Sequence, residues 1–396
     1  MVVCSKKASS PIFPALKFFC FFCCALVIGL LPAAAIAAPE PSQAIGELCV
    51  LPALEKTLTR YRQIDKQGGW PRIAAGPAMR LGDTDDRVAL LRKRLVATDD
   101  LAADAGQGNV FDETLLQGVQ KFQTRHGLAD DGVVGPKTLT ELNVPVSERI
   151  RQLAATLERC RPLPQLLERR HILVNIADFS LKLFDEDKLL LSMPVIVGKT
   201  YRQTPVFSGR IASLVLNPTW EVPHSIATKD ILPKVQKDPG YLEQLHFRVF
   251  RDWTENSEVD PATVNWGSLS AKRFPYRIRQ DAGPANALGR IKFLFPNPYD
   301  VYLHDTPSRE LFRKDSRTFS SGCIRVAKPL ELAIYLLKNT PLDSMEALTA
   351  AIARDKTKSI LIPSPIAVHI VYMTAWVDHE GIVQFRPDIY NRNPIR

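Results

Sequence analysis

The sequence has few of the features that mark membrane, metal-binding or nucleic-acid-binding proteins. Beyond one apolar stretch near the N-terminus, no segment is long and apolar enough to span a bilayer. No group of His, Cys and Asp has the spacing of a metal site, so no metal ion is predicted. There is no nucleic-acid-binding motif, no internal repeat and no low-complexity segment. These absences favour a globular protein without a nucleic-acid partner.

Length and charge narrow the class further. The 396 residues predict two or three domains with ample core, and a hydrophobic content of 45% does not indicate disorder. The formal net charge is +9, of which three charges are lysines in the first 37 residues, leaving 9 − 3 = +6. A basic chain can meet nucleic acid, anionic lipid or an acidic polymer. Because the charge here is scattered, it is equally typical of a solubilising surface.

Residues 1–38 have the pattern of an export signal. Three lysines precede an apolar stretch at 18–31, and Ala35-Ile36-Ala37 supplies the small residues that a signal peptidase needs. We expect cleavage after Ala37 or Ala38. The alternative is an uncleaved membrane anchor, because the apolar stretch approaches spanning length if it is extended through Ala38.

Cysteine usage separates one thiol from the rest. Of seven cysteines, four lie within the predicted signal, which leaves Cys49, Cys160 and Cys323. Three thiols in an oxidising compartment suggest one pair and one free thiol. A bridge between Cys49 and Cys160 would staple the N-terminal region, although two buried free thiols are equally compatible with the sequence. Cys323 is then the odd cysteine, in agreement with a reactive role.

Cys323 and His304 are the candidate catalytic pair. Fifteen residues separate His304 from the run Ser320-Ser321-Gly322-Cys323-Ile324-Arg325-Val326, so one thiol follows one imidazole after a single loop. A thiol attacks an acyl group as the thiolate, and a free cysteine with a pKa near ~8.5 needs a base or a positive field to reach that form at neutral pH. His304 is the expected base. A random cysteine is more often an inert core thiol, but the neighbouring residues favour a reactive one.

The residues around Cys323 suggest how acyl transfer would be supported. Gly322 lets the backbone pass close to a substrate, and the N–H groups from Ser321 to Cys323 can point at a developing oxyanion. Arg325 adds positive charge. Because Pro329 and the apolar stripe after it predict a helix, we expect Cys323 to lie on a strand-to-helix loop.

The N-terminal half is predicted to be helical. Within a scaffold segment, 39–78, residues 46–65 place their leucines near one helical face. Residues 79–145 form a compact unit with two amphipathic helical patterns, a turn and a third helix that begins at Gly135-Pro136. A helical linker, 146–169, follows.

From residue 170 onward the pattern changes to strands. Residues 225–286, approximately, lack this strand pattern, because their aromatic and basic residues occur among polar ones. This segment is predicted to be either an inserted, partly helical lid or a plain surface insertion. At the C-terminus, runs on both sides of a hairpin turn are expected to complete the sheet. The β-rich runs are 171–176, 180–184, 189–197, 209–220, 288–295, 367–376 and 382–385.

His304, its spacing and the run Ser320 to Val326 resemble the active-site signature of the L,D-transpeptidases, cysteine enzymes that cross-link bacterial peptidoglycan. Most of that family has a histidine where this chain has Ser321. The chain is similar to the large subgroup with Ser-Ser-Gly-Cys, an N-terminal peptidoglycan-binding module and a substrate-capping insertion. The resemblance implies an α+β multidomain protein, with a three-helix peptidoglycan-binding domain at 79–145 and a mainly-β catalytic sandwich at 170–396 that carries the capping insertion.

The resemblance also implies a reaction in the periplasm. Cys323 would attack the third residue of a tetrapeptide stem, release the terminal D-alanine and form a thioester, which an amine of an acceptor stem resolves into a 3→3 cross-link. His304 would act as base and then acid, and Arg325 would support the loop or bind a carboxylate. Tyr302 and Trp220 are the further substrate-binding candidates. No cofactor is implied, acylation by carbapenems is expected, and other wall synthases are possible partners.

Two alternatives remain open at the level of sequence. Water instead of an amine would make the protein an L,D-carboxypeptidase or endopeptidase of peptidoglycan stems. An inert Cys323 would leave a non-catalytic protein that binds the cell wall through its module. The intact His304, Gly322 and Arg325 argue against the second alternative.

Overall fold

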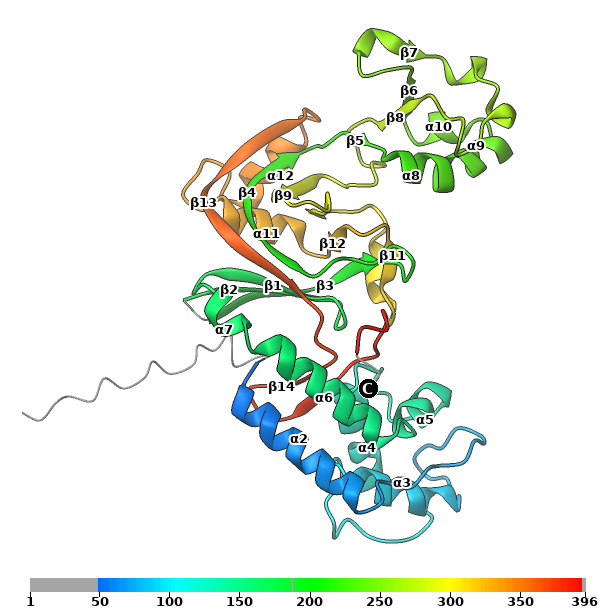
Figure 1. Ribbon diagram of the computed structural model, residues 1–396, viewed down its shortest axis with the longest axis vertical. Coiled ribbons are helices and arrows are strands. Elements are labelled where there is room, and N and C mark those ends of the chain that lie inside the picture. Colours follow the sequence, from blue (N-terminus) through cyan, green and yellow to red (C-terminus); the bar gives the residue numbers. More distant parts are fainter. Residues whose placement is uncertain (1–48, 187, 394–396) are drawn as a thin grey trace, which may run out of the picture. The chain divides into compact units, whose positions relative to one another are not determined.

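A β-sheet that closes on itself forms the framework of the C-terminal half (Figure 1). This computed structural model describes residues 49–186 and 188–393, and the predicted export signal, 1–38, lies outside them. The nine strands of the sheet have the order β11-β3-β12-β10-β9-β4-β13-β1-β2, and β3 also pairs with β2. Their bounds are β1 His171–Asn175, β2 Ser180–Asp185, β3 Lys188–Gly198, β4 Phe207–Leu216, β9 Ile291–Leu294, β10 Leu303–His304, β11 Thr318–Ser320, β12 Ile324–Val326 and β13 Lys358–Val371.

The hydrophobic sequence of these strands accounts for the core that they enclose. All five residues of β1 are buried, because β1 lies between β2 and the long strand β13. Helices α11 (Pro329–Leu336) and α12 (Met345–Ile352) contribute Leu332, Leu336 and Leu348 to the same core. Ser344 caps α12, since its hydroxyl accepts a hydrogen bond from the Ala347 N–H at 3.1 Å. Apolar burial thus fixes the sheet to which the site residues are attached.

A separate small core supports the predicted three-helix unit. Helices α3 (Arg87–Val96), α4 (Glu113–Arg125) and α5 (Pro136–Leu142) bury the apolar residues that the sequence pattern indicates, including Leu91, Phe122 and Leu142. The Asp112 side chain caps α4 by accepting from the Leu115 N–H at 2.9 Å. The three helices were therefore predicted correctly from their periodicity and boundary residues.

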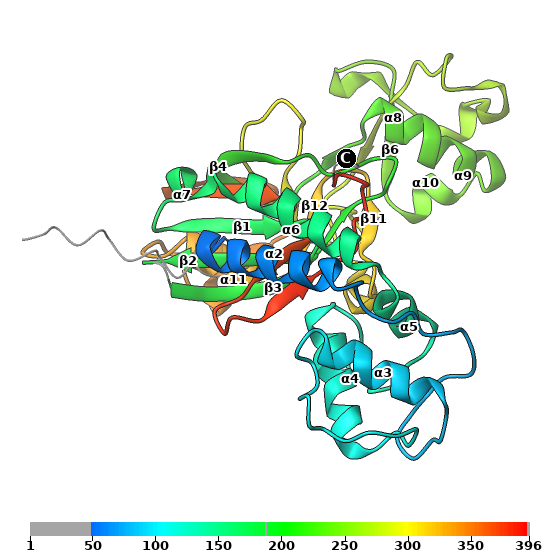
Figure 2. The same cartoon turned by 60° about the horizontal axis from the view of Figure 1, so that its bottom comes forward.

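Two longer helices connect this unit to the sheet. Helix α2 (Leu51–Lys66) lies beside α6 (Val146–Cys160), and the short α7 (Leu163–Leu166) follows (Figure 2). Helix α2 ends where Gly68 and Gly69 adopt φ values of +94° and +76°, which glycine tolerates better than other residues. A disulfide joins Cys49, just before α2, to Cys160 at the end of α6.

The C-terminal tail was predicted to complete the main sheet, and only its first run does so: residues 367–371 pair with β1 and β4 as the end of β13, whereas the return strand does not. Strand β13 ends at Val371, and β14 (Ala375–Val377) and β15 (Val383–Phe385) form their own two-stranded sheet. Trp376 and Phe385 pack in a hydrophobic cluster with Leu54 and Leu58 of α2 and Leu153 of α6. The hairpin buries its apolar side chains against α2 and α6, and this burial replaces pairing with the main sheet.

The insertion has a sheet and a core of its own. Its strands have the order β5-β8-β6-β7 and include Trp220, which the sequence interpretation had placed in the catalytic core. Its buried cluster includes Leu232, Val249 and Ile278. The strands are β5 Trp220–Glu221, β6 Phe247–Phe250, β7 Glu258–Val259 and β8 Arg277–Gln280, and the helices are α8 His224–Ile226, η1 Ala227–Ile231, α9 Leu232–Lys237, α10 Tyr241–Gln244, η2 Glu255–Ser257, η3 Pro261–Thr263 and η4 Trp266–Ser268. Within residues 49–186 and 188–393, no helix has the length and apolar character needed to cross a membrane.

The disulfide predicts a redox-dependent stability of the N-terminal helices. Its cysteines are 111 residues apart, so reduction frees a long loop in the unfolded chain. We expect the Cys49→Ser/Cys160→Ser variant to lose about 2–4 kcal/mol of unfolding free energy. Urea unfolding, with and without reductant, measures this loss in a Cys323→Ala background that removes thiol exchange. An unchanged midpoint on reduction of the background protein would contradict the prediction.

Candidate active site

Strand register brings the basic residues of the site to one face of the sheet. In the parallel pair of β10 and β12, His304 is opposite Arg325, and in the antiparallel pair of β10 and β9 it is opposite Lys292. Side chains at paired positions lie on the same face, as do residues two apart along a strand. Tyr302 and Cys323, two residues before His304 and Arg325, therefore belong to the neighbouring row of this face.

The Cys323 loop joins two strands, so the predicted strand-to-helix loop was wrong. Residues 324–326 form strand β12, which pairs with β10 and β3, and the helix begins only at Pro329. The buried Ser320 hydroxyl shapes the loop: it donates to the Cys323 carbonyl at 2.5 Å and accepts from the Gly322 N–H at 3.2 Å. Gly322 has a φ of +120°, a region that disfavours any residue with a Cβ.

This loop leaves two N–H groups for a ligand. The Gly322 N–H is occupied by Ser320, whereas those of Ser321 and Cys323 have no hydrogen-bond partner among the described residues. Of the N–H groups from Ser321 to Cys323 that were predicted to stabilise an oxyanion, only these two are therefore available as donors. The Ser321 hydroxyl accepts from the Arg202 guanidinium at 2.9 Å, and Arg202 also pairs with Asp230 of the insertion.

Opposing effects set the protonation state of Cys323. Burial raises the pKa of its thiol above the ordinary value, and hydrogen bonds from the Tyr302 backbone and hydroxyl, together with the charges of Lys292 and Arg325, lower it in part. The thiol also donates weakly to the Asp300 carbonyl, at 3.7 Å. The unliganded cysteine is thus mainly a thiol that requires a proton acceptor before it can attack.

His304 is neutral in this environment. Burial and the nearby charge of Arg325 lower its pKa to about 3, although its hydrogen bonds with the Asp305 and Leu288 carbonyls act in the opposite direction. Its Nδ1 lies 2.6 Å from the Asp305 carbonyl oxygen. Because a carbonyl only accepts, this contact requires a proton on Nδ1.

Tyr302 connects the thiol with the rest of the site. Its hydroxyl hydrogen-bonds Cys323 and the Trp220 side chain. Burial, the Cys323 charge and the Cys323 hydrogen bond raise the pKa of Tyr302 far above its usual range, and the Trp220 hydrogen bond lowers it in part. The Lys292 ammonium lies 3.9 Å from the centre of the Tyr302 ring, and the His304 ring is 5.6 Å away. No hydrogen bond joins His304 to Cys323 directly in the described chain.

A cleft of about 1830 Å³ contains all these groups. One wall comes from the sheet and the other from the insertion, which contributes Trp220 as well as residues of α8, η1 and β8. The Nε of Arg325 is buried and has no hydrogen-bond partner among the described residues. No group of three or more His, Cys, Asp or Glu within the described ranges is arranged to hold a metal ion.

The structure thus brings seven of the predicted site residues to one cleft and separates the other two. Cys49 and Cys160 form their disulfide at the N-terminal helices. The residues around the thiol that sequence reasoning missed are Lys292, Ser320 and Arg202. Lys292 had a signal in the sequence, because it is the polar position in the apolar strand Ile291–Leu294. The cleft is lined by Trp220, Tyr302, His304, Ser321, Gly322, Cys323 and Arg325.

Two family models match parts of the chain. Residues 169–343 match the YkuD family model, described as "L,D-transpeptidase catalytic domain", and residues 84–142 match the model described as "Putative peptidoglycan binding domain". Over 240 residues the chain is 39% identical to a Haemophilus influenzae protein described as "Putative L,D-transpeptidase". That alignment covers 61% of this chain and 47% of the relative, so the chain spans about half of the relative's length.

Solved structures of L,D-transpeptidases are similar only at low identity. A structure from Stackebrandtia nassauensis has a TM-score of 0.27 at 13% identity, and the match covers 76% of this chain and 97% of that structure's chain. A structure from Enterococcus faecium has a TM-score of 0.23 at 11% identity, and the match covers 52% of this chain and 51% of that structure's chain. The sequence matches are therefore the stronger likeness.

Lys292 is expected to set the reactivity of Cys323. Its positive charge lowers the pKa of the thiol, so Lys292→Met should raise the pH at which iodoacetamide alkylation reaches half its maximal rate and slow alkylation at pH 7.5. Mass spectrometry of the Cys323 peptide follows the reaction. Lys358→Met, at an exposed position of β13, is the matched control and should leave the profile unchanged. Equal profiles for the two variants would rule out this role.

His304 should remain unprotonated through the physiological range. Its folded pKa of about 3 is below its unfolded value of 6.5, so its contribution to stability is complete above pH 6.5 and is lost as the pH falls toward 3. We expect its ring resonances, assigned by comparison with His304→Gln, to show no titration between pH 8 and pH 5. A midpoint near pH 6.5 in the NMR titration would refute the neutral assignment.

Proposed function

Because the chain carries an L,D-transpeptidase catalytic domain and a peptidoglycan-binding domain, we propose that it forms 3→3 cross-links between tetrapeptide stems of peptidoglycan. The observation that carries the proposal is the position of the Cys323 thiol in a cleft, beside Tyr302 and in the field of Lys292 and Arg325. A wall-binding protein with an inert thiol does not need this arrangement.

The first half-reaction transfers the stem to the enzyme. The Cys323 sulfur forms a bond with the carbonyl carbon of the third stem residue, and the bond from that carbon to the D-alanine nitrogen breaks. The thiol proton passes to the neutral His304 and then to the leaving amine. In an unliganded site such hydrogen bonds are often incomplete and close only with substrate, and the Tyr302 hydroxyl lies beside the thiol.

The second half-reaction returns the free enzyme. The amine of an acceptor stem attacks the thioester carbonyl, the new carbon–nitrogen bond replaces the carbon–sulfur bond, and the sulfur regains a proton. In both halves the N–H groups of Ser321 and Cys323 stabilise the developing oxyanion. The insertion side of the cleft limits access of water, which favours the amine over hydrolysis.

The charge of the cleft supports a peptide substrate with free carboxylates. Its lining includes eight Lys or Arg and four Asp or Glu residues, a surplus of 8 − 4 = 4 positive charges. Arg325 lines the cleft and offers its guanidinium to a carboxylate, and the released D-alanine carries one. The same acylation chemistry makes carbapenems expected inhibitors, and other wall synthases are the expected partners.

We also propose that the protein works in the periplasm after export by residues 1–38. The disulfide between Cys49 and Cys160 supports this location, because such bonds form and persist in oxidising compartments.

The proposal is tested by incubating residues 38–396 with disaccharide-tetrapeptide and analysing the products by mass spectrometry. We expect loss of D-alanine and a cross-linked dimer, with at least a ~10³-fold slower reaction in Cys323→Ala because the covalent step is removed. Asn339→Ala, on an exposed turn, is the control. Loss of D-alanine without dimer would favour the carboxypeptidase, and equal activity of Cys323→Ala would refute the catalytic role.

A further inference from the structure

The C-terminal segment contacts a loop beneath the catalytic cysteine. The Tyr390 hydroxyl donates to the Gly198 carbonyl at 2.5 Å and accepts from the Thr204 N–H at 3.3 Å. Arg392 binds the same loop through the Thr204 carbonyl at 3.1 Å and the Gln203 side chain at 2.8 Å. Residues 390–392 thus hold the turn that follows β3.

Thr204 extends this network to the nucleophile loop. Its side chain is fully buried, accepts from the Gly198 N–H at 2.9 Å and donates to the Gly322 carbonyl at 2.8 Å. Gly322 is the residue at φ +120°, immediately before Cys323. One hydroxyl therefore fixes the peptide plane that contains the Cys323 N–H, one of the two oxyanion donors.

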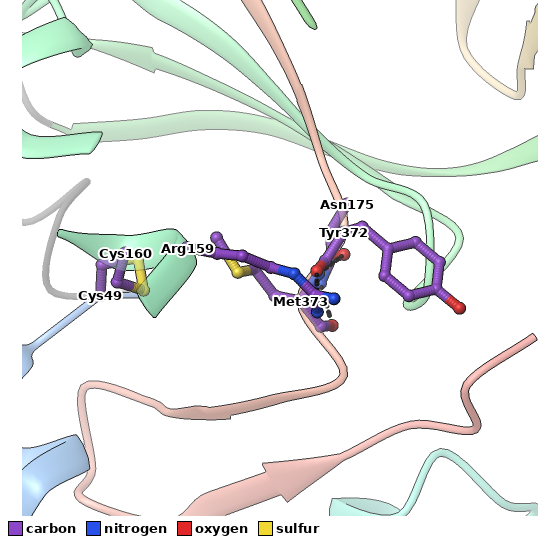
Figure 3. Close-up of a disulfide and its surroundings, with 6 residues drawn as sticks. All are labelled: Cys49, Arg159, Cys160, Asn175, Tyr372 and Met373. Atoms are coloured by element: carbon purple, nitrogen blue, oxygen red, sulfur yellow. Dashed lines mark hydrogen bonds between the residues drawn. A yellow bond between two sulfur atoms is a disulfide. The ribbon is translucent and has the colours of Figure 1, made fainter. Parts of the chain in front are cut away.

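The segment is itself anchored at the end of α6. Arg159 donates to the Tyr372 carbonyl at 3.0 Å, to the Arg392 carbonyl at 2.6 Å and to the Asn393 side chain at 3.1 Å. Figure 3 shows Arg159 extending from α6 toward Tyr372 and Met373, while its neighbour Cys160 bonds Cys49 on the other side. Asn175 holds Met373 by two hydrogen bonds of 3.0 Å, also drawn there.

Aromatic stacking sets the position of Tyr390. Its ring stacks on Tyr372 at a centroid distance of 5.7 Å and an interplanar angle of 11°, and its N–H donates to the Tyr372 hydroxyl at 2.9 Å. That hydroxyl in turn donates to Asp388 at 2.6 Å. Because the ring is held by these contacts, loss of the Tyr390 hydroxyl removes only its own two bonds to Gly198 and Thr204, and the segment and the Arg392 bonds stay in place.

We propose that Tyr390 is a positioning residue for acyl transfer, which acts on Cys323 through Thr204 and the Gly322 carbonyl. This inference rests on the proposed function, since it concerns the same thiol. The Tyr390 hydroxyl fixes the turn, the turn presents Thr204, and Thr204 holds the nucleophile loop in the conformation that directs the Cys323 N–H into the cleft. No substrate contact by Tyr390 is required.

The test compares Tyr390→Phe with Tyr335→Phe. Tyr335 is the matched control, because its hydroxyl also makes two hydrogen bonds, to Arg170 and Asp185 at 2.8 Å each, and neither partner lines the cleft. Displacement of a reacting group by about 1 Å can cost ~10²-fold in rate. We expect Tyr390→Phe to lower kcat for D-alanine release by at least ~10-fold with KM within about twofold, and Tyr335→Phe to leave both unchanged.

Thr204 supplies a second, independent pair of variants. Thr204→Val removes the hydroxyl at constant shape and should reproduce the kcat loss, whereas Thr204→Ser keeps the hydroxyl and should restore at least half of the activity. Thermal unfolding of each variant identifies any loss due to instability. Equal kcat values for Tyr390→Phe and Tyr335→Phe would overturn the proposal.

A readout without substrate separates this inference from the proposed function. Release of the nucleophile loop should reduce the burial of the thiol, so the pH midpoint of Cys323 alkylation should fall in Tyr390→Phe and not in Tyr335→Phe. If wild-type protein releases no D-alanine, the proposed function fails, and the alkylation profiles alone decide the role of Tyr390. Identical profiles in that case would reject it.

Discussion

The pairing of β10 between β9 and β12 is the constraint on which the site depends. Each of these strands has two to four residues, yet their register places Lys292, His304 and Arg325 side by side and sets Cys323 next to Tyr302. A shift of one residue would turn these side chains to the opposite face. The apolar residues between them, such as Leu303 and Ile324, are fully buried, so hydrophobic burial and catalytic alignment are fixed by the same register.

The electrostatics of the site follow from this arrangement. Burial disfavours both a thiolate and an imidazolium, so the unliganded pair is neutral. The cations beside it favour negative charge on sulfur, and they also disfavour positive charge on His304. In the proposed reaction, substrate must therefore tighten the proton-transfer geometry, and its carboxylates would offset the cationic field around the imidazole.

Local patterns in the sequence predicted much of the fold and the centre of the site. Helices α3 to α5 were found because periodicity and capping residues are local signals, and Cys323 and His304 could be proposed as a pair because both lie within the short stretch 304–326. The supporting residues Thr204 and Tyr390 were missed, because each acts across more than 110 positions of sequence. Periodicity predicts that a segment is a strand but does not identify the strand with which it pairs. For this reason the hairpin of β14 and β15 was assigned to the wrong sheet.

The cluster that joins Leu54 and Leu58 to Trp376 and Phe385 has a consequence for how the protein is made. The apolar face of α2 emerges early in synthesis, whereas the hairpin that covers it emerges more than 300 residues later. Contacts of such high sequence separation form slowly, and the exposed face is prone to association until they do. The N-terminal helices therefore reach their final burial only after the last strand of the chain has been made.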